Sequence, residues 1–280
     1  HEGTARAYAS SLRSMQRYLG KKDFPFIKLS SRIISDYQGK LLASGICDNT
    51  IGFYLHNIKA LFRKGCREMG LELPCPFRDI SIKTEKTLKR SLDPVVIKTL
   101  SAIELEKDSP LSLARDIFMF SFYTRGMSFV DIALLKKRHV FPGEICYRRH
   151  KTDQLMRVGI NKEISRILER YKNVPGEYIF PLFPAERDPY AGYRNAYHRI
   201  RYSLGKISRV IGLEFPLRLH AARHSWATIA KVNGASVHVI GECLGHTSEK
   251  TTRIYLKELD HSALDAVNNQ VADFILAVDD

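Results

Sequence analysis

The stretch LRLHAARHSWATIAKVNGASVHVIGECLGHTSEKTTRIYLKEL, residues 217–259, decides the fold of this chain. Its first part has apolar residues at helical spacing and predicts a helix that carries His220 and Arg223, three positions apart and therefore on one face. A second helix is expected over 237–244, because Gly245 is the residue type that most easily ends a helix in the left-handed conformation. A third helical stretch follows a short polar turn.

His246 comes directly after this glycine, and Tyr255 lies nine residues further on, in the third helical stretch. A phenol with a pKa of about 10 is a poor nucleophile at neutral pH unless cations stabilise its oxyanion or a base takes its proton. Arginine and histidine provide both functions, and their charge would also stabilise a pentacoordinate phosphorus transition state. The spacing of cations and phenol therefore predicts chemistry at a phosphate.

At these residues the chain resembles the tyrosine recombinase (phage integrase) family. The family's His-x-x-Arg box is matched by His220 and Arg223, its Leu-Gly-His box ends at His246, and its nucleophilic tyrosine is matched by Tyr255. The resemblance covers about residues 90–260 and extends more loosely over the N-terminal part. It implies a site-specific recombinase or integrase, as mobile elements carry, that cuts and rejoins DNA through a 3′-phosphotyrosyl intermediate.

The chain departs from the family pattern at the first catalytic arginine. That arginine usually lies three residues before an acidic residue, and if Asp131 is that acid, Ser128 stands in its place. A serine cannot replace the charge, so the phosphate needs a cation from elsewhere. Arg125, one turn earlier, is the first choice for this cation, and Arg149 is the alternative substitute.

A β-hairpin is expected near the middle of the chain. Residues 143–151 and 155–160 predict two strands around a turn at 152–154. Alternation along a strand would put Arg149 and Lys151 on the same side. In the family a lysine on this hairpin is the general acid that protonates the leaving 5′ oxygen, and Lys151 occupies that position; nearby cations would lower its pKa and favour proton donation.

The expected fold is mainly α with a small antiparallel β-sheet. We expect an N-terminal helical core-binding domain at 1–88 and an α+β catalytic domain at 92–280. Two prolines and a polar, charged run indicate a linker at about 74–91. Apolar periodicity outside the quoted stretch predicts further helices from Thr4 past Tyr18, over 30–42, from about Asn49, from Asp93, and over 111–123, 164–171 and 190–211.

The charge balance favours a nucleic-acid partner. Lys and Arg outnumber Asp and Glu by 44 to 30, a net charge of +14 that suits a dense phosphate backbone. The first 90 residues contain 17 of the basic and 8 of the acidic residues. The helix from Asn49 carries the residues expected to bind DNA phosphates: Lys59, Arg63, Lys64 and Arg67. In the family, this module clamps one side of double-stranded DNA.

Several other classes of site are not expected. The five cysteines are odd in number and lack a Cys-x-x-Cys pair, which argues against a disulfide framework and a zinc site. The phosphotyrosyl bond keeps the energy of the broken bond, and no P-loop pattern occurs, so we expect no nucleotide or metal cofactor.

The absence of a membrane-spanning apolar run or signal peptide predicts a cytoplasmic, nucleoid-associated protein that does not contact membranes. Because it begins at His1, the chain is interpreted as a fragment or a trimmed protein.

Residues 261–280 are expected to form an acidic tail. From Ser262 onward it contains four Asp and no Lys or Arg, with apolar residues at helical spacing. Such an apolar stripe favours binding in a groove on a protein surface, either on the same chain or on a neighbouring subunit. The resemblance implies that the tail docks on a neighbouring protomer and that the protein forms a homo-oligomer, a tetramer, on DNA. DNA-bending accessory proteins are further candidate partners.

Two other functions stay open. A type IB topoisomerase-like enzyme shares the chemistry but relaxes DNA as a monomer, and the acidic tail argues against it. A non-catalytic DNA-binding protein on a recombinase scaffold is the alternative from a different class, because Ser128 replaces a catalytic charge.

Overall fold

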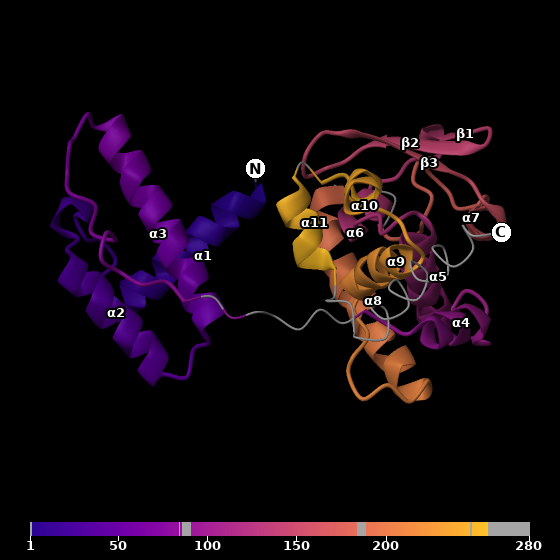
Figure 1. Ribbon diagram of the computed structural model, residues 1–280, viewed down its shortest axis with the longest axis horizontal. Helices are drawn as coiled ribbons and strands as arrows, with labels where there is room; N and C mark the ends of the chain where they lie inside the picture. Colours follow the sequence, from indigo (N-terminus) through magenta and orange to yellow (C-terminus); the bar gives the residue numbers. More distant parts are fainter. Residues whose placement is uncertain (1, 84, 86–90, 184–188, 247, 257–280) are drawn as a thin grey trace, which may run out of the picture. The chain divides into compact units, whose positions relative to one another are not determined.

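The computed structural model describes residues 2–83, 85, 91–183, 189–246 and 248–256, apart from the side chains of 2, 189–191, 254 and 255. The chain divides into two compact units, His1–Leu88 and Lys89–Asp280 (Figure 1). Most of the described residues are helical, and their strands form one small antiparallel sheet. The predicted fold class, mainly α with a small antiparallel sheet, is confirmed. None of the described helices is long and apolar enough to span a membrane.

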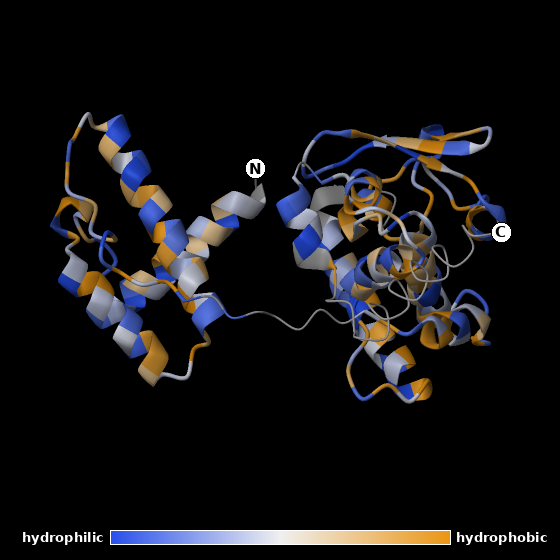
Figure 2. Cartoon of the chain, viewed as in Figure 1, coloured by the Kyte–Doolittle hydropathy of each residue, from blue (hydrophilic) through white to orange (hydrophobic). Residues whose placement is uncertain are grey.

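Three helices build the N-terminal unit: α1 (Glu2–Leu19), α2 (Ser31–Ala43) and α3 (Asp48–Glu68), with a 3₁₀ turn η1 (Phe26–Lys28) between the first two. Helix α3 packs against α1 and α2, and hydrophilic and hydrophobic residues alternate along it (Figure 2). The apolar face predicted for this helix lies in the core of the unit, whose buried residues are Met15, Ile34, Tyr37, Ile51, Leu55, Ile58, Phe62 and Phe77.

The first part of the expected linker packs onto this unit. Phe77 is buried in the core, because removing a large aromatic side chain from water lowers the free energy of the folded state. Asn49, near the start of α3, forms two hydrogen bonds of 3.1 Å with the backbone of Glu85. The segment leading to Glu85 is therefore attached to the helices. Residues 84 and 86–90 of the expected linker lie outside the described residues.

Helix α5 (Pro110–Tyr123) is the centre of the C-terminal unit. Ser109 caps it by accepting a hydrogen bond from the N–H of Ser112, and Pro110 takes the first helical turn, where a missing N–H costs nothing. All residues from 116 to 121 are buried, because other helices cover α5 on several sides. These are α4 (Pro94–Ala102), α7 (Lys162–Arg170), α8 (Pro189–Val210) and α9 (Leu219–Val232).

A short helix α6 (Phe129–Ala133) and a 3₁₀ turn η2 (Lys137–His139) lead from this bundle to the sheet. The sheet has the order β1-β2-β3, with all pairs antiparallel: β1 (Val140–Phe141), β2 (Glu144–Arg148) and β3 (Leu155–Gly159). Alternate side chains of the two longer strands enter the core: Ile145, Tyr147, Met156 and Val158.

The two long strands are shorter than the predicted 143–151 and 155–160. Strand β2 ends before Arg149, whose carbonyl accepts a hydrogen bond of 2.8 Å from the N–H of Asp153. Asp153 has a left-handed φ of 54°, so the chain already turns at Lys151. Lys151 therefore lies in the turn, and the prediction that it shares a strand face with Arg149 is wrong.

The three helices predicted from the sequence of residues 217–259 are confirmed. They are α9, α10 (Val237–Leu244) and α11 (Glu249–Tyr255), and they pack against one another. Ala227, Ile240 and Leu244 form a small core between them. Gly245 ends α10 with a left-handed φ of 63°, as predicted.

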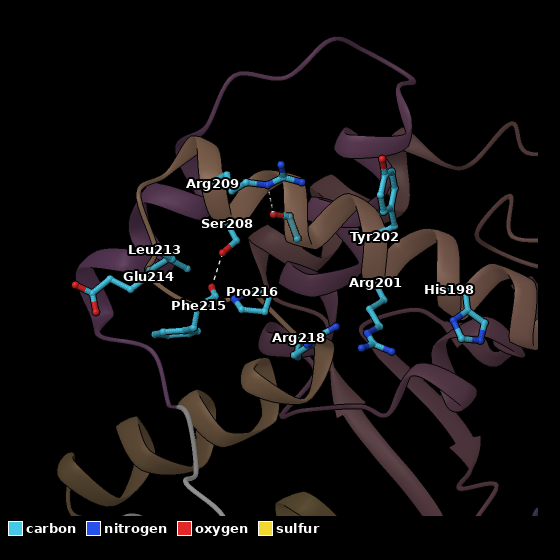
Figure 3. Close-up of a pocket in the computed structure, with 11 residues that line it drawn as sticks. His198, Arg201, Tyr202, Ser208, Arg209, Leu213, Glu214, Phe215, Pro216 and Arg218 are labelled. Atoms are coloured by element: carbon cyan, nitrogen blue, oxygen red, sulfur yellow. Dashed lines mark hydrogen bonds between the residues drawn. The ribbon is translucent and has the colours of Figure 1, made fainter.

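A hollow of about 660 Å³ lies between α8 and the loop that leads into α9 (Figure 3). Ser208 on α8 donates a hydrogen bond from its hydroxyl to the carbonyl of Phe215, which holds the loop against the helix. The hollow is lined by Arg201 and Arg209 of α8 and by Arg218, the residue that precedes α9. It is therefore a basic surface next to the helix that carries His220 and Arg223.

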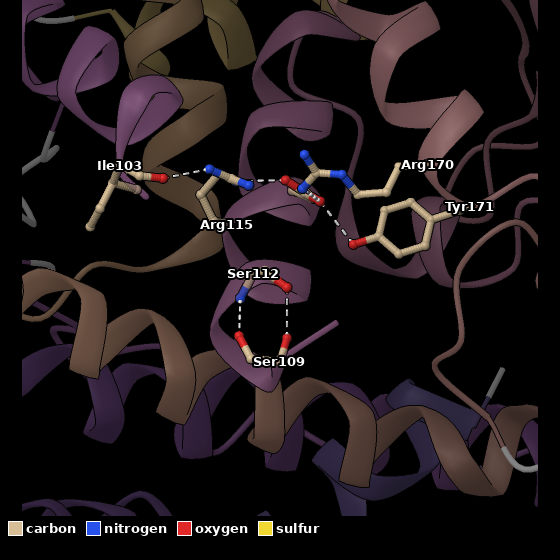
Figure 4. Close-up of polar contacts among 7 residues, drawn as sticks. Ile103, Ser109, Ser112, Arg115, Arg170 and Tyr171 are labelled. Carbon is tan, nitrogen blue, oxygen red and sulfur yellow. Dashed lines mark hydrogen bonds and ion pairs between the residues drawn. The ribbon is translucent and has the colours of Figure 1, made fainter. Parts of the chain in front are cut away.

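A buried carboxylate ties α7 to α5 (Figure 4). Asp116 accepts hydrogen bonds from Arg115 Nε at 2.6 Å, from Arg170 Nη1 at 2.7 Å and from the hydroxyl of Tyr171 at 2.9 Å. Its side chain is only 4% exposed. Burial, followed by the charge of Asp116, raises the pKa of Tyr171, so this phenol remains a hydrogen-bond donor.

We predict that Asp116→Ala lowers the free energy of unfolding by about 3–5 kcal/mol, because it leaves the charge of Arg115 buried without its carboxylate. Tyr171→Phe removes one hydrogen bond and should cost about 1 kcal/mol. The exposed pair Arg166–Glu163 is the control, and Arg166→Ala should change stability by less than about 1 kcal/mol. Chemical denaturation of each variant measures these differences. Equal effects of Asp116→Ala and Arg166→Ala would contradict the prediction.

Candidate functional site

The guanidinium of Arg223 is the centre of the candidate site. Arg223 lies on α9 and is 5% exposed. Its Nη1 donates to the carbonyl of Gly126 at 2.7 Å, and its Nη2 donates to the carbonyl of Leu244 and to His246 Nε2, the latter at 3.0 Å. One buried charge thus connects three segments: the loop after α5, helix α9 and the end of α10.

Two glycines with left-handed backbone make this arrangement possible. Gly126 has a φ of 76°, and a Cβ there would lie 2.5 Å from Arg223 Cγ. At Gly245 a Cβ would lie 2.9 Å from Met156 Sδ and 3.3 Å from Arg149 Cδ. Both positions require glycine for backbone conformation and for space.

His246 is half-buried beside Arg223. Its pKa is lowered to about 4, first by burial, then by the charges of Arg223, Arg149 and Lys151, and last by the nearby His220. Its Nδ1 lies 3.0 Å from the hydroxyl oxygen of Thr252, on α11. The imidazole is therefore neutral at pH 7. The charged groups that lower its pKa are the cations of the site.

Arg149 enters the site from the hairpin turn. Its Nη1 donates a hydrogen bond to the carbonyl of Gly245, the residue before His246. Lys151, two residues later, is exposed and close enough for its charge to lower the pKa of His246. The turn thus brings two cations to the same imidazole.

Asp131 holds this turn in place. Its carboxylate is buried and accepts hydrogen bonds from the hydroxyl of Ser128 at 2.6 Å and from the N–H of His150 at 2.7 Å. His150 lies between the two cationic residues of the turn. Ser128 therefore serves Asp131 as a hydrogen-bond donor.

Arg125 lies in the same charged region but is oriented differently. It has a left-handed φ of 59°, and its Nη1 donates to the carbonyl of Arg157 on β3 at 3.4 Å. Burial and then the charge of Asp131 raise the pKa of Tyr147 on β2, whereas Arg223, Arg149 and Arg125 oppose this rise. The side chain of Arg125 therefore reaches the middle of β3.

The last two predicted residues occupy helix ends. His220 is exposed near the start of α9, with its ring 4.8 Å from that of His224. Tyr255 is the last residue of α11, and its side chain lies outside the described residues. The structure thus brings together Arg223, His246, Arg149, Lys151 and His220, and it ends α11 at the predicted nucleophile.

The residues predicted to bind DNA phosphates lie on α3 of the N-terminal unit: Lys59, Arg63, Lys64 and Arg67. Lys64 forms an exposed ion pair of 3.6 Å with Glu68. A second basic surface, which sequence reasoning missed, surrounds a hollow of about 640 Å³ lined by Arg13, Arg17, Lys21 and Lys22. Arg13 and Arg17 lie in the C-terminal half of α1, and Lys21 and Lys22 follow its end, so this cationic cluster could have been found from the sequence.

Sequence reasoning also missed three residues of the candidate site in the C-terminal unit. Asp131 was considered only as a marker for the arginine position, and Thr252 and Tyr147 carried no motif. Asp131 bonds to the N–H of His150 in the hairpin turn, and Thr252 contacts His246, beyond the end of α10, so the spacing within one element contains no signal for these contacts. Among the described residues, no group of three or more His, Cys, Asp or Glu is arranged to hold a metal ion.

Comparison with known proteins agrees with this geometry. The model of the phage integrase family matches residues 91–261, and that of the phage integrase SAM-like domain matches residues 1–77. The chain belongs to the phage integrase family. The two matches cover most of its length, including every cation of the site.

Relatives and solved structures extend this result. The chain is 26% identical over 226 residues to the tyrosine recombinase XerC of Shewanella oneidensis, covering 77% of this chain and 70% of the relative. It is 24% identical over 262 residues to XerD of Pseudomonas putida, covering 91% and 86%. Both relatives are named tyrosine recombinases, and the alternatives of a topoisomerase or a binding-only protein are not favoured.

The fold is similar to that of a lambda integrase dimer bound to a COC′ core site, with a TM-score of 0.69 and 17% identity over 93% of this chain and 90% of that one. A Tn1549 transposon integrase in complex with circular intermediate DNA gives a TM-score of 0.66 at 16% identity, covering 95% and 99%. At these identities the similarity establishes the fold.

We predict that Gly126→Ala disrupts the site, because its Cβ would collide with Arg223 in addition to straining the backbone. Gly143→Ala is the matched control, since Gly143 has a φ of 83° but nothing within 4 Å of an added Cβ. The control should cost about 1 kcal/mol of stability, and Gly126→Ala about 2–4 kcal/mol. NMR titration should also show a higher pKa for His246 in Gly126→Ala, as Arg223 moves away. An unchanged pKa together with equal stability losses would contradict the prediction.

Proposed function

We propose that this protein is a site-specific DNA recombinase in which Tyr255 is the nucleophile and the cations around Arg223 and His246 bind the scissile phosphate. The observation that carries the proposal is the convergence of positive groups from α9 and the hairpin turn on the imidazole of His246, at the end of α10. The helix that ends at Tyr255 is joined to the same imidazole through Thr252. A phosphate diester is the substrate class that such a cluster stabilises best in a transition state.

In the proposed reaction, the oxygen of Tyr255 forms a bond to phosphorus while the bond from phosphorus to the 5′ oxygen breaks. His220 accepts the phenol proton, and Lys151 gives a proton to the departing 5′ oxygen. The product is a 3′-phosphotyrosyl link and a free 5′ hydroxyl. Because the new link is also a phosphate diester, a 5′ hydroxyl from another strand can reverse the step without a nucleotide cofactor.

The substitute for the first arginine is, in this proposal, Arg149 rather than Arg125. Arg149 bonds to the carbonyl next to His246 and its charge lowers the pKa of that imidazole. Arg125 instead reaches the carbonyl of Arg157 on β3. A guanidinium has a fixed donor geometry, so one that already points to the end of α10 needs little reorganisation to contact a phosphate there. Ser128 supports this arrangement by bonding to Asp131, which holds the turn.

The basic surfaces of both units support double-stranded DNA as the partner. We assign phosphate contacts to the α3 residues Lys59, Arg63, Lys64 and Arg67, as the sequence predicts, and to the cluster at the end of α1. Arg201 and Arg218 add a surface beside α9. Exposed cations of this kind position a protein on the DNA backbone without reading its sequence. Residues 1–88 would thus be the core-binding domain and 92–280 the catalytic domain.

Assembly on DNA is part of the proposal. The lambda integrase structures are described as a dimer on a core site and as a tetramer on a Holliday junction, which supports a homo-oligomer, a tetramer, here. The acidic tail, residues 261–280, lies outside the described residues, and we propose that it docks on a neighbouring subunit. A cytoplasmic, nucleoid-associated location and DNA-bending accessory proteins complete this proposal.

We predict that the protein forms a covalent adduct with a pool of nicked suicide duplexes of randomised sequence, from which its DNA site can be recovered and sequenced. Tyr255→Phe should form no adduct. Arg149→Ala should lower the rate of adduct formation by roughly 100- to 1,000-fold, whereas Arg125→Ala should lower it by less than about tenfold. Gel electrophoresis under denaturing conditions measures the adduct.

Each result excludes a specific alternative. Absence of adduct with the wild type at all protein and salt concentrations would support the binding-only protein. Relaxation of DNA without strand exchange between two recovered sites would support the topoisomerase. An adduct with Tyr255→Phe would reject the nucleophile, and a larger effect of Arg125→Ala than of Arg149→Ala would reverse the assignment of the arginine.

We predict that Lys151→Ala lowers the rate of cleavage by roughly 100- to 10,000-fold, because the 5′ oxygen then leaves without a proton. Replacing that oxygen by sulfur should restore the rate, since a thiolate is a good leaving group without protonation. Arg149→Ala is the control, and sulfur should not rescue it, because its proposed role is to stabilise the phosphate. Failure of sulfur to rescue Lys151→Ala would exclude this lysine as the general acid.

A further inference from the structure

Thr252 connects the helix of the proposed nucleophile to the imidazole of His246. It lies on α11, three residues before Tyr255, and its side chain is fully buried. Its hydroxyl oxygen is 3.0 Å from His246 Nδ1. A Cβ added to Gly241 of α10 would lie only 2.9 Å from this oxygen. Thr252 is therefore packed closely between α10 and the imidazole, and no motif of the sequence assigns it a role.

The partners of His246 determine which ring nitrogen carries the proton. A guanidinium can only donate, so Nε2 must accept the 3.0 Å hydrogen bond from Arg223 Nη2. The single proton of the neutral ring is then on Nδ1, which donates to the hydroxyl of Thr252. Burial and the charges of Arg223, Arg149 and Lys151 keep it neutral, with a pKa of about 4.

This tautomer suits the protein without DNA but not a role at a phosphate. An oxygen of a phosphate diester only accepts hydrogen bonds, so an imidazole that contacts it through Nε2 must carry a proton there. A neutral ring reaches that state if one proton leaves Nδ1 and one is taken up at Nε2, with no change in charge. Nδ1 then becomes an acceptor and needs a donor, or it is left buried and unsatisfied.

A hydroxyl is the neutral group best suited to both states, because it accepts from Nδ1–H and donates to a bare Nδ1 by rotating its hydrogen. A main-chain carbonyl could serve only the first state. The 3.0 Å contact is preserved in both, so neither α11 nor the ring needs to move. The same contact keeps the helix of Tyr255 at a fixed distance from the imidazole.

We propose that Thr252 is a positioning residue whose hydroxyl lets His246 exchange between an Nδ1–H tautomer, bound to Arg223, and an Nε2–H tautomer that donates to the scissile phosphate. The part of this proposal that concerns the DNA-bound protein rests on the proposed function. The Nδ1–H assignment for the DNA-free protein stands on the hydrogen bonds alone. This makes Thr252 a link between phosphate binding and the nucleophile's helix.

The test combines histidine ¹⁵N NMR with adduct formation. NMR of the DNA-free wild type should show His246 with its proton on Nδ1. Addition of the duplex recovered from the randomised pool, with Tyr255→Phe to prevent cleavage, should move the proton to Nε2. An Nε2–H ring in the DNA-free protein, or no change on DNA binding, would overturn the proposal.

Variants of Thr252 test the hydroxyl itself. Thr252→Val keeps the shape but leaves Nδ1 unsatisfied in the DNA-bound state, so it should slow adduct formation by roughly 10- to 100-fold and hinder the tautomer change. Thr252→Ser should restore the rate to within about threefold, because it keeps the hydroxyl. The matched control is Thr251→Val on the same helix, whose hydroxyl contacts Ser248 and should be dispensable for the rate.

The outcomes separate this proposal from the function on which it rests. Equal rates for Thr252→Val and the wild type, or no recovery with Thr252→Ser, would overturn the role of Thr252 while adduct formation by the wild type still supports a recombinase. Absence of adduct with the wild type would overturn the function and the DNA-bound half together. If Thr252→Val does not fold, the NMR measurements on the wild type and on Tyr255→Phe decide.

Discussion

The buried guanidinium of Arg223 is the interaction on which the rest of the C-terminal unit depends. Removing a positive charge from water costs several kcal/mol unless hydrogen-bond acceptors replace the lost hydration. Here the acceptors are the carbonyls of Gly126 and Leu244 and the imidazole of His246. The loop after α5, the end of α10 and helix α9 must therefore meet at one place. The site and the fold of this unit are consequently specified by the same hydrogen bonds.

Backbone conformation is as important to this site as the charged side chains. Gly126 and Gly245 both have left-handed φ values and both lie against an arginine. Their lack of a Cβ brings a main-chain carbonyl within reach of a guanidinium, Arg223 in one case and Arg149 in the other. Rigid main-chain acceptors orient the arginines before a substrate binds, which reduces the reorganisation needed in the reaction.

In the proposed function, Arg149 in the hairpin turn replaces the missing charge without a change of fold. Ser128 donates a hydrogen bond to Asp131, and the same carboxylate accepts the N–H of His150. The turn is therefore fixed by a buried side chain on α6, while the residues on either side of His150 carry the positive charges. The Thr252 hydroxyl has a comparable role on the other side of His246, where it joins α11 to the ring. Both links are short polar contacts in low-dielectric surroundings, where hydrogen bonds have their largest effect.

The sequence by itself determined the helices over 217–259, the left-handed end at Gly245, the order of the family's motifs and the basic character of the chain. These features depend on local spacing and composition, which a single segment expresses without its neighbours. Only the tertiary structure decided that Arg149 contacts the end of α10, that Phe77 is buried in the core of the N-terminal unit, and that Lys151 lies in a turn. It also showed the hydrogen bonds of Asp131 and the contact of Thr252 with His246. These results depend on hydrogen bonds and packing between residues that are distant in the chain or lie on different elements. Many of the acceptors are main-chain carbonyls, which every residue has, so the amino-acid sequence does not indicate which of them is used.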